Sequence, residues 1–373
     1  MKKMLLEDCC EILDSMRVPI TAANRQEGPY PYYGANGIQD YVVDYIFDDD
    51  LVLLAEDGGN FGSKTKPIAY RVSGKCWVNN HAHVLKPKEG MNVDFLCYSL
   101  MFYNTDGLVN AATRQKLTQT VMRKMLIPDM PIDKQMEIVN QLNKVIAIRN
   151  LRQQELQKMD ELIKAQFVEM FGDPEFNNMG WNTAYLGSLC SVGSSKRIYQ
   201  NEQSTEGIPF LRISDLVNLI DTGVLTCDLY IPKSRFDELF DQELVPQEGD
   251  ILLTARGTLG KCYVVQAEDR FYFQDGMISW LSKFSDLVSS LYISYLFEMP
   301  GFRKQIYELQ AGSTVAYLSI AMAKKLSVML PPVGLQKQFS DFVKQVEKSK
   351  VVVQKALDET QLLFDSLMQK YFG

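Results

Sequence analysis

The sequence has no apolar run approaching the roughly 18 residues that a membrane-spanning helix needs, which argues against a membrane protein. Its 7 cysteines are an odd number and include no Cys-x-x-Cys pair, a usage typical of reduced thiols in a cytoplasmic protein. Acidic residues stand at positions 7 and 8, where a signal peptide would have its apolar core, so no signal peptide is expected. Basic excess is also missing: the net charge is −7. Any DNA-binding surface must therefore be local or shared with a partner.

The usual catalytic motifs are absent as well. There is no G-x-x-x-x-G-K-[ST] loop for a nucleoside triphosphate and no Asn/Asp-Pro-Pro-Tyr/Phe segment of an adenine methyltransferase. The only histidines, His81 and His83, stand two residues apart without a cysteine or carboxylate cluster in the sequence around them. The simpler interpretation is a pair on one strand, hydrogen-bonded or facing solvent, and no metal site is expected. The sequence predicts a chain that is not an enzyme and binds no cofactor.

What the sequence does contain is an internal repeat, which decides the fold class before any single motif. An offset of 201 aligns residues 113–172 with residues 314–373 without a gap. The clearest matches at this offset are Leu117 with Leu318, Ile127 with Val328, Gln135 with Gln336, and Phe171-Gly172 with Phe372-Gly373. A weaker offset of 180 pairs Leu6 with Leu186, Cys10 with Cys190 and Arg17 with Arg197, and chance similarity remains an alternative there. The chain is predicted to be two copies of one module, each a variable globular part followed by a similar tail.

Each tail is predicted to be one long helix, over residues 132–170 and 335–371. Proline stands near each start, where it is tolerated, and good helix formers dominate the remainder of each tail. Apolar residues recur at alternating spacings of three and four, as in a coiled coil. The two helices are expected to bury their apolar stripes against each other, although each stripe packing on its own globular part is the alternative. The side chains expected in this pairing are Leu156, Met159, Ile163 and Phe167 from the first tail, and Val346, Val353 and Leu363 from the second.

The globular parts have the pattern of mixed α/β (α+β) domains. Short apolar runs bounded by glycine or acidic residues predict strands, for example at 50–54 and 250–254. The segment 172–180, rich in glycine, proline and asparagine, indicates the boundary between modules. The predicted organisation is a globular domain over 1–130, a long helix over 131–172, a second globular domain over 173–331 and a second long helix over 332–373.

Each globular part also contains a glycine-rich loop between two strands, followed by polar residues. Glycine permits tight turns with positive φ, and Arg, Lys, Asn, Gln and Asp are the side chains that contact phosphates and base edges. Glu56-Asp57 stands before one loop where Ala255-Arg256 stands before the other. Ordinary hairpins with polar surfaces are the alternative. The candidate DNA contacts are Arg17, Asn60, Lys64, Asn80 and His81 in the first copy, and Arg197, Arg256, Lys261, Gln274 and Asp275 in the second.

Three segments of the first copy together resemble a known family. Residues 30–41, 57–62 and 79–87 are similar to the target recognition domain of type I restriction-modification specificity (S) subunits. The tail signatures, Ile127-Pro128 leading to Gln135 and Leu330-Pro331-Pro332 leading to Gln336, are similar too. The resemblance covers essentially the whole chain, and the tandem plan is more specific than any one motif.

The resemblance implies two recognition domains at opposite ends of an antiparallel helix pair. It implies that each domain reads one half of a bipartite, asymmetric site in double-stranded DNA. Two methylation (M) subunits would bind the chain and carry S-adenosylmethionine, and restriction (R) subunits would add activities that use ATP and Mg²⁺, so the S chain itself would hold no catalytic residue. One alternative is a specificity subunit of a related type II-like system. A second is a stand-alone enzyme with a pseudo-twofold site.

Overall fold

The computed structural model describes residues 2–109, 115–310 and 316–373; Thr113 and Thr314, with which the repeat begins, lie outside these ranges. The chain divides into two compact units. Unit 1 contains residues 1–154 and 354–373, and unit 2 contains residues 155–353. Each unit therefore combines a globular part with a portion of both long helices.

Both units are mixed α/β, as the sequence predicted. In unit 1 the elements before the long helices are β1 (Lys3–Leu5), α1 (Leu6–Cys9), β2 (Cys10–Ile12), β3 (Tyr30–Gly34), β4 (Gly37–Val42), β5 (Phe47–Ala55), β6 (Ala69–Val78), β7 (Ala82–Pro87), α2 (Val93–Met101), α3 (Gln119–Arg123) and β8 (Leu126–Pro128). In unit 2 the strands and α-helices that stand between the two long helices are β9 (Thr183–Tyr185), α5 (Leu186–Leu189), β10 (Ser191–Gly193), β11 (Ile208–Leu211), α6 (Ile213–Thr222), β12 (Tyr230–Ile231), α7 (Lys233–Asp241), β13 (Ile251–Thr254), β14 (Cys262–Val264), β15 (Tyr272–Phe273), β16 (Ile278–Ser282), α8 (Ser290–Glu298), α9 (Pro300–Glu308), α10 (Ile320–Ala323) and β17 (Ser327–Met329).

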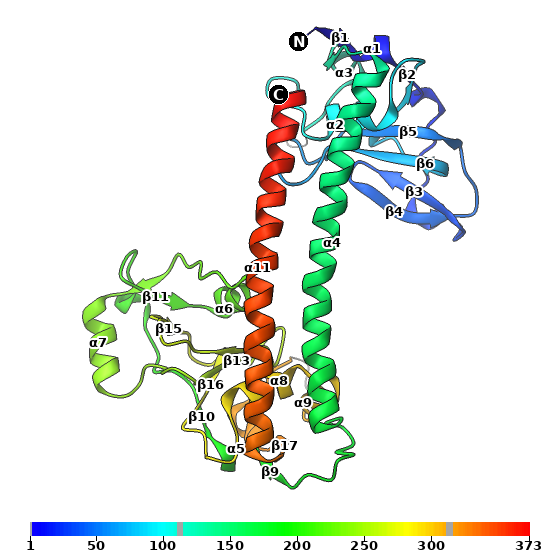
Figure 1. Ribbon diagram of the computed structural model, residues 1–373. Helices are drawn as coiled ribbons and strands as arrows, with labels where there is room; N and C mark the ends of the chain where they lie inside the picture. Colours follow the sequence, from blue (N-terminus) through cyan, green and yellow to red (C-terminus); the bar gives the residue numbers. More distant parts are fainter. Residues whose placement is uncertain (1, 110–114, 311–315) are drawn as a thin grey trace. The chain divides into compact units, whose positions relative to one another are not determined.

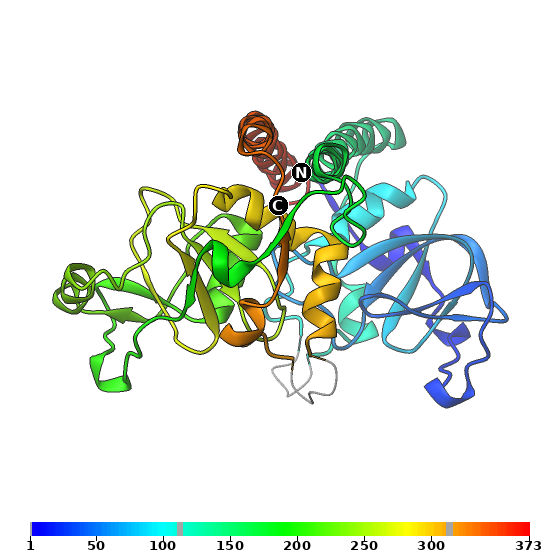
Figure 2. The same ribbon diagram turned by 90° about the horizontal axis from the view of Figure 1, so that it is seen from below.

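The two long helices are α4 (Ile132–Phe171) and α11 (Val333–Phe372), close to the predicted bounds (Figure 1). Figure 2 shows them nearly end-on. Within each unit their segments pair antiparallel, as expected. The contacts that show this direction are Tyr371 with Gln141 at 2.8 Å and Arg149 with Gln361 at 3.3 Å in unit 1, and Lys350 with Asp160 at 2.7 Å in unit 2. In the described part of the chain, no helix is long and apolar enough to cross a membrane.

The side chains between the helix segments largely follow the predicted stripe. In unit 2, Ile163 is 1% exposed, Phe167 0% and Val346 9%, while Leu156, Met159 and Val353 are partly buried. The expectation for Leu363 needs correction, because this side chain is 51% exposed. Phe364 and Met368 are buried in its place. A straight α-helix has 3.6 residues per turn, so a strict 3,4 repeat drifts off the contact line toward the end of α11.

Strand pairing supports both repeat offsets. In unit 1, Met4 of β1 lies opposite Ile127 of β8, and in unit 2, Ala184 of β9 lies opposite Val328 of β17. The first members of these pairs differ by 180 positions and the second members by 201. The weaker offset therefore marks structurally equivalent residues rather than a chance match.

The sheets of the two units share four strands and then diverge. Unit 1 has one sheet in the order β2-β7-β5-β6-β3-β4. Unit 2 has a sheet in the equivalent order β10-β16-β13-β14 and a second sheet in the order β12-β11-β15. Helix α6 joins β11 to β12, where unit 1 has the tight β3–β4 turn. The expected variable globular part is thus a shared four-strand arrangement with different additions.

A buried glutamine joins the long helix to the globular part in the same way in each unit. Gln135 accepts the Asn92 N–H at 2.9 Å and donates to the carbonyl oxygen of Gly90. Gln336 accepts the Ser289 N–H at 2.9 Å and donates to the carbonyl oxygen of Leu287. Asn92 and Ser289 are the N-caps of α2 and α8. These buried glutamines, 1% and 0% exposed, bond backbone groups of the globular part, which explains why both tail signatures contain one.

Candidate nucleic-acid interface

Four segments of unit 1 meet where β5 ends, and we call them the first loop edge: residues 13–17, 56–66, 79–81 and 115–117. The end of β5 pairs with the start of β7, Ala55 opposite Ala82, so the segments flanking those residues are neighbours. The Glu56 N–H donates to the His81 carbonyl oxygen at 2.9 Å, and the Leu117 N–H donates to the Glu56 carbonyl oxygen at 2.7 Å. Backbone hydrogen bonds therefore hold the edge together.

The second loop edge is the equivalent place in unit 2, formed by residues 194–197, 255–261, 274–277 and 316–318. Thr254 at the end of β13 lies opposite Ile278 at the start of β16. The Ala255 N–H donates to the Met277 carbonyl oxygen at 2.9 Å, and the Leu318 N–H donates to the Ala255 carbonyl oxygen at 2.9 Å. The two edges thus share one backbone pattern, with Ala255 in the place of Glu56.

The glycine-rich loops begin alike at both edges. Gly58 has φ 63° and Gly257 has φ 67°, and the loops end at Gly62 with φ 75° and Gly260 with φ 76°. These are left-handed values that a residue with a Cβ rarely adopts. The prediction of tight turns with positive φ is confirmed, and the residue before each first glycine is Asp57 in unit 1 and Arg256 in unit 2.

The structure places the predicted contacts of the first copy on the first loop edge. Lys64 and Asn80 are exposed, while Asn60 is partly buried and donates to the Pro67 carbonyl oxygen. His81 is partly exposed: its Nδ1 lies 2.7 Å from Asp57 Oδ1, and its N–H donates to Asn79 Oδ1. The contact with Asp57 limits the orientation of the His81 ring, so the ring is held at the surface of the edge.

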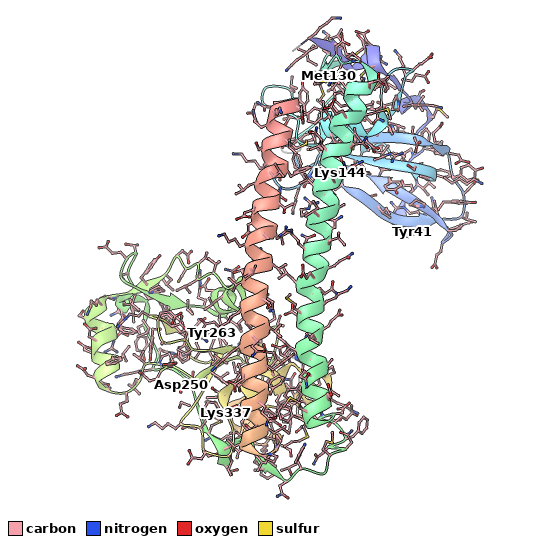
Figure 3. All side chains as sticks on the ribbon, in the orientation of Figure 1. Tyr41, Met130, Lys144, Asp250, Tyr263 and Lys337 are labelled. Atoms are coloured by element: carbon pink, nitrogen blue, oxygen red, sulfur yellow. The ribbon has the colours of Figure 1, made fainter. Side chains whose placement is uncertain are left out.

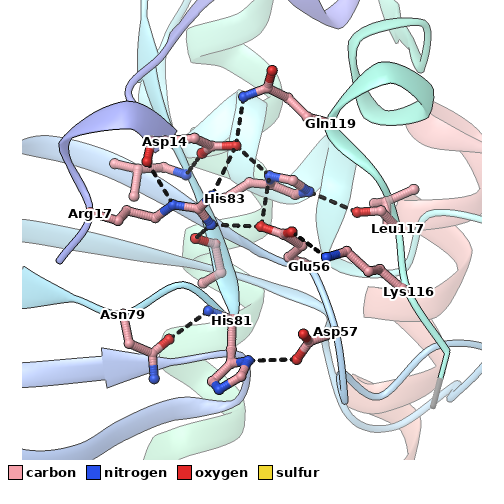
Figure 4. Close-up of polar contacts among 12 residues, drawn as sticks. Asp14, Arg17, Glu56, Asp57, Asn79, His81, His83, Lys116, Leu117 and Gln119 are labelled. Atoms are coloured by element: carbon pink, nitrogen blue, oxygen red, sulfur yellow. Dashed lines mark hydrogen bonds and ion pairs between the residues drawn. The ribbon is translucent and has the colours of Figure 1, made fainter. Parts of the chain in front are cut away.

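Arg17 lies on the inner side of this edge, and its predicted role needs correction (Figure 4). Its side chain is 12% exposed, and its guanidinium contacts Glu56 at 2.7 Å and the Ala82 carbonyl oxygen at 2.7 Å. The Nε group donates to the Asp14 carbonyl oxygen. With these donors occupied inside the unit, Arg17 holds the edge together rather than facing a ligand. Its counterpart in the repeat, Arg197, is 65% exposed.

Arg17 belongs to a buried ion network that the sequence did not reveal. His83 Nδ1 lies 2.6 Å from Asp14 Oδ2, and its Nε2 lies 2.9 Å from the Leu117 carbonyl oxygen. Lys116 contacts the second oxygen of Glu56 at 2.9 Å. Burial disfavours the charged form of both carboxyl groups. Hydrogen bonds outweigh it, from His83 to Asp14 and from Arg17 and Lys116 to Glu56, and hold the pKa of each below its ordinary value.

The same network brings together Asp14, Glu56 and His83, whose ligand-type atoms all lie within 4.8 Å of one another. Such a group has the composition of a metal site. Here the two oxygens of Glu56 already face the cations Arg17 and Lys116. A divalent ion would have to displace or approach these positive charges, so the geometry fits an internal ion network better than a metal centre.

The predicted contacts of the second copy gather on the second loop edge. Arg197 pairs with Asp275 at 3.0 Å, and Lys261 pairs with Asp221 of α6. Gln274 is partly buried and its N–H donates to the Leu211 carbonyl oxygen. Arg256 is exposed, and its guanidinium carbon lies 5.0 Å from the centre of the Tyr317 ring.

Two residues of the edges escaped the sequence analysis. Lys116 and Tyr317 lie opposite Asp57 and Arg256 in isolated β-bridges, one in each unit. Their only signal was the offset of 201, which aligns them with each other in the repeat. Exposed Lys196 also belongs to the second loop edge, which is therefore locally basic although the chain is acidic.

Comparison with known proteins agrees with this architecture. The family model described as the type I restriction modification DNA specificity domain matches residues 1–160 and 178–359. A putative type I restriction enzyme specificity subunit from Haemophilus influenzae is 30% identical over 347 residues, covering 92% of this chain and 86% of that protein. The EcoprrI specificity subunit of Escherichia coli is 24% identical over 121 residues, covering 32% of this chain and 29% of that one.

Two solved structures share the fold. The type I restriction-modification S subunit from M. genitalium has a TM-score of 0.57 at 14% identity, covering 100% of this chain and 96% of that chain. A chain from work on complex assembly and conformational transition of the type I system has a TM-score of 0.58 at 17% identity, with coverage of 100% and 97%.

The repeated module and its loop edges define a tandem DNA-specificity protein. The chain belongs to the type I restriction-modification DNA specificity family, which confirms the resemblance seen in the sequence. Its function is that of a type I specificity subunit, the recognition of particular DNA sequences. The comparisons do not favour the alternative of a type II-like system.

Proposed function

We propose that the first and second loop edges are the DNA-reading surfaces of this chain, and that each reads one half of a bipartite, asymmetric site. The observation that carries the proposal is the equivalence of the two edges. Equivalent backbone hydrogen bonds and positive-φ glycines present different side chains, Asp57 with His81 in one unit and Arg256 with Tyr317 in the other. A shared frame with exchanged polar side chains is suited to reading different base sequences.

The test is to map methylated adenines in the genome of a host that carries this system. We expect an interrupted, non-palindromic motif with an unread spacer. Arg256→Ala should weaken recognition of one half-site by about 1–3 kcal/mol, the discrimination that a bidentate arginine provides, and leave the other half unchanged. An uninterrupted palindrome, or relaxation of both halves together, contradicts the model of two readers.

We further propose that the long helices carry the docking surfaces for two methylation subunits. Large apolar side chains remain exposed on α4 and α11, and apolar side chains that lie together on a surface favour burial by a partner. They include Ile148, Leu151 and Leu162 on α4, and Val351, Val352 and Leu362 on α11. Because the chain contains the module twice, it can present two similar surfaces to two copies of one partner.

Native mass spectrometry of the co-expressed complex should accordingly show two methylation subunits for each copy of this chain. Leu151→Asp places a charge at a position that is 64% exposed and should weaken docking without disturbing the fold. Phe176→Asp, at a 72% exposed position outside the long helices, is the matched control. A complex that stops at a ratio of 1:1 counts against this proposal.

We also infer that this chain supplies no catalytic group, and that S-adenosylmethionine, ATP and Mg²⁺ bind to the methylation and restriction subunits. The chemical content of the loop edges supports this, because their carboxylates and imidazoles are engaged in ion pairs and hydrogen bonds. The purified chain should transfer no methyl group to DNA until methylation subunits are added. Methyl transfer by the chain alone contradicts the inference.

A further inference from the structure

The residue before the first glycine of each loop occupies a structurally equivalent position, which we call the bridged position. In unit 1 Asp57 forms an isolated β-bridge with Lys116, and in unit 2 Arg256 forms one with Tyr317. The backbone is alike in the two units. The Leu117 N–H donates to the carbonyl oxygen before Asp57, and the Leu318 N–H donates to the carbonyl oxygen before Arg256. At the bridged position itself, the side chains have opposite charge.

Arg256 differs in how it is held from Arg197 and Lys261, the two other predicted contacts of the second loop edge that carry a positive charge. Arg197 and Lys261 are each paired with a carboxylate, Asp275 and Asp221. Among the described residues, Arg256 has no carboxylate partner and lies instead over the face of Tyr317, with 5.0 Å between the guanidinium carbon and the ring centre. Contact with an aromatic face restrains a guanidinium while leaving its N–H donors, which lie in the guanidinium plane, able to reach an acceptor.

Two acceptors side by side on a flat edge match these donors best. The major-groove edge of guanine presents O6 and N7 in this arrangement, and arginine contacts them bidentately. The carboxylate of Asp57 offers only acceptors when ionised, so the bridged position of unit 1 has the opposite chemistry. Whatever else Asp57 contacts, it cannot donate hydrogen bonds to O6 and N7 of a guanine.

We propose that Tyr317 is a positioning residue that holds Arg256 for bidentate contact with a guanine, and that the bridged position makes the two half-sites chemically different. This inference rests on the proposed function, in which the loop edges read DNA. The inference specifies a guanine in one half-site. It also gives a role to Tyr317, which was not among the predicted contacts. Tyr317 acts through Arg256 and need not touch the DNA.

The experiment uses the full chain in complex with its methylation subunits and duplexes bearing the methylated site. Each guanine of the half-site affected by Arg256→Ala is replaced in turn by 7-deazaguanine, which lacks the N7 acceptor. For the unmodified complex we expect one position at which this replacement lowers affinity. The sensitivity should disappear in Arg256→Ala and in Arg256→Lys, because lysine keeps the charge but not the planar pair of donors.

The tyrosine variants separate positioning from general stability. Tyr317→Leu should reduce the sensitivity to 7-deazaguanine by about 2- to 5-fold, the range expected for losing a partly exposed cation–π contact. Tyr317→Phe retains the aromatic face and should keep the sensitivity. Discrimination at the other half-site should stay unchanged in every variant, a readout that a misfolded complex would not preserve.

Arg270→Ala provides the matched control for charge. Arg270 is exposed and lies in the 265–271 loop, which is tied to the opposite end of β13 because Val265 donates to the Asp250 carbonyl oxygen. Figure 3 labels Asp250, which directly precedes β13, and Tyr263, which lies on the neighbouring strand β14. This variant removes the same charge from unit 2 and should leave the guanine dependence intact.

Three outcomes overturn the inference while leaving the proposed function standing. One is a half-site in which no guanine shows N7 dependence. Another is an Arg256→Ala complex that loses affinity equally for all sequences with a weaker salt dependence, which indicates a phosphate contact. The third is a Tyr317→Leu complex with undiminished sensitivity. The proposed function fails separately, through the absence of an interrupted methylated motif.

Discussion

Replacing Phe167 with alanine is expected to lower the free energy of unfolding of unit 2 by about 3–5 kcal/mol, the usual cost of removing a buried aromatic ring. Phe167 is 0% exposed. Its ring centre lies 5.6 Å from that of Tyr292, 5.5 Å from that of Phe339 and 4.9 Å from that of Phe171. Because these rings come from α4, α8 and α11, the cavity would open where both long helices meet the globular part.

Hydrogen exchange followed by mass spectrometry measures this loss separately in each unit. Peptides of α8 and β13 should lose protection, and the exposed Phe176→Ala serves as the control because Phe176 is 72% exposed. If Phe167→Ala exchanges like the unmodified protein, α4 does not contribute to the core of unit 2 as described.

Replacing Glu56 with glutamine is expected to destabilise unit 1 by about 3 kcal/mol, near the lower limit for removing one partner of a buried ion pair. The side chains of Glu56 and Arg17 are only 13% and 12% exposed, so the positive charge of Arg17 would lose its main partner in a place that water reaches poorly. The first loop edge should lose order with it, since Glu56 also contacts Lys116. Peptides of β5 and β7 should then exchange faster than those of β13 and β16.

Low pH should reduce the difference in stability between the unmodified chain and Glu56→Gln. The pKa of Glu56 is lowered in the folded chain, chiefly by hydrogen bonds from Arg17 and Lys116 that outweigh the effect of burial. A carboxyl group with a depressed pKa stabilises the fold above its ordinary pKa, and this stabilisation is lost as pH falls through the folded value. The stability of the unmodified chain and of Glu56→Gln should therefore converge in acid.

The exposed pair Lys233–Asp237 is the matched control for Glu56→Gln. Its side chains are 75% and 51% exposed, and pairs of this kind contribute about 0.3–0.5 kcal/mol. Asp237→Asn should therefore lower the stability measured by hydrogen exchange by no more than this free energy, in either unit. An equal effect of the two substitutions rules out a special role for the network of Glu56.

Much of the fold could be predicted because its signals lie along the chain. Helix-forming composition and proline at the start predicted α4 and α11 within two residues of their bounds. The helical stretch from Ser290 to Glu308 is divided into two helices, α8 and α9, because Pro300 lacks the N–H that a continuous helix would use. Local sequence patterns thus predict where the long helices lie better than they predict where a helical stretch is broken.

The sequence by itself determined that the chain is two copies of one module, each with a glycine-rich loop and a long helix. Repeat offsets and residue spacing can be read directly from the order of the residues. Tertiary structure alone decided which side chains of those patterns face outward. It turned Arg17 into the unit and left Arg197 exposed, although the repeat pairs them. It exposed Leu363, and it placed Tyr317 beneath Arg256. The physical reason is that burial and contact depend on strand register, helical twist and partners tens of residues away, which no local pattern specifies.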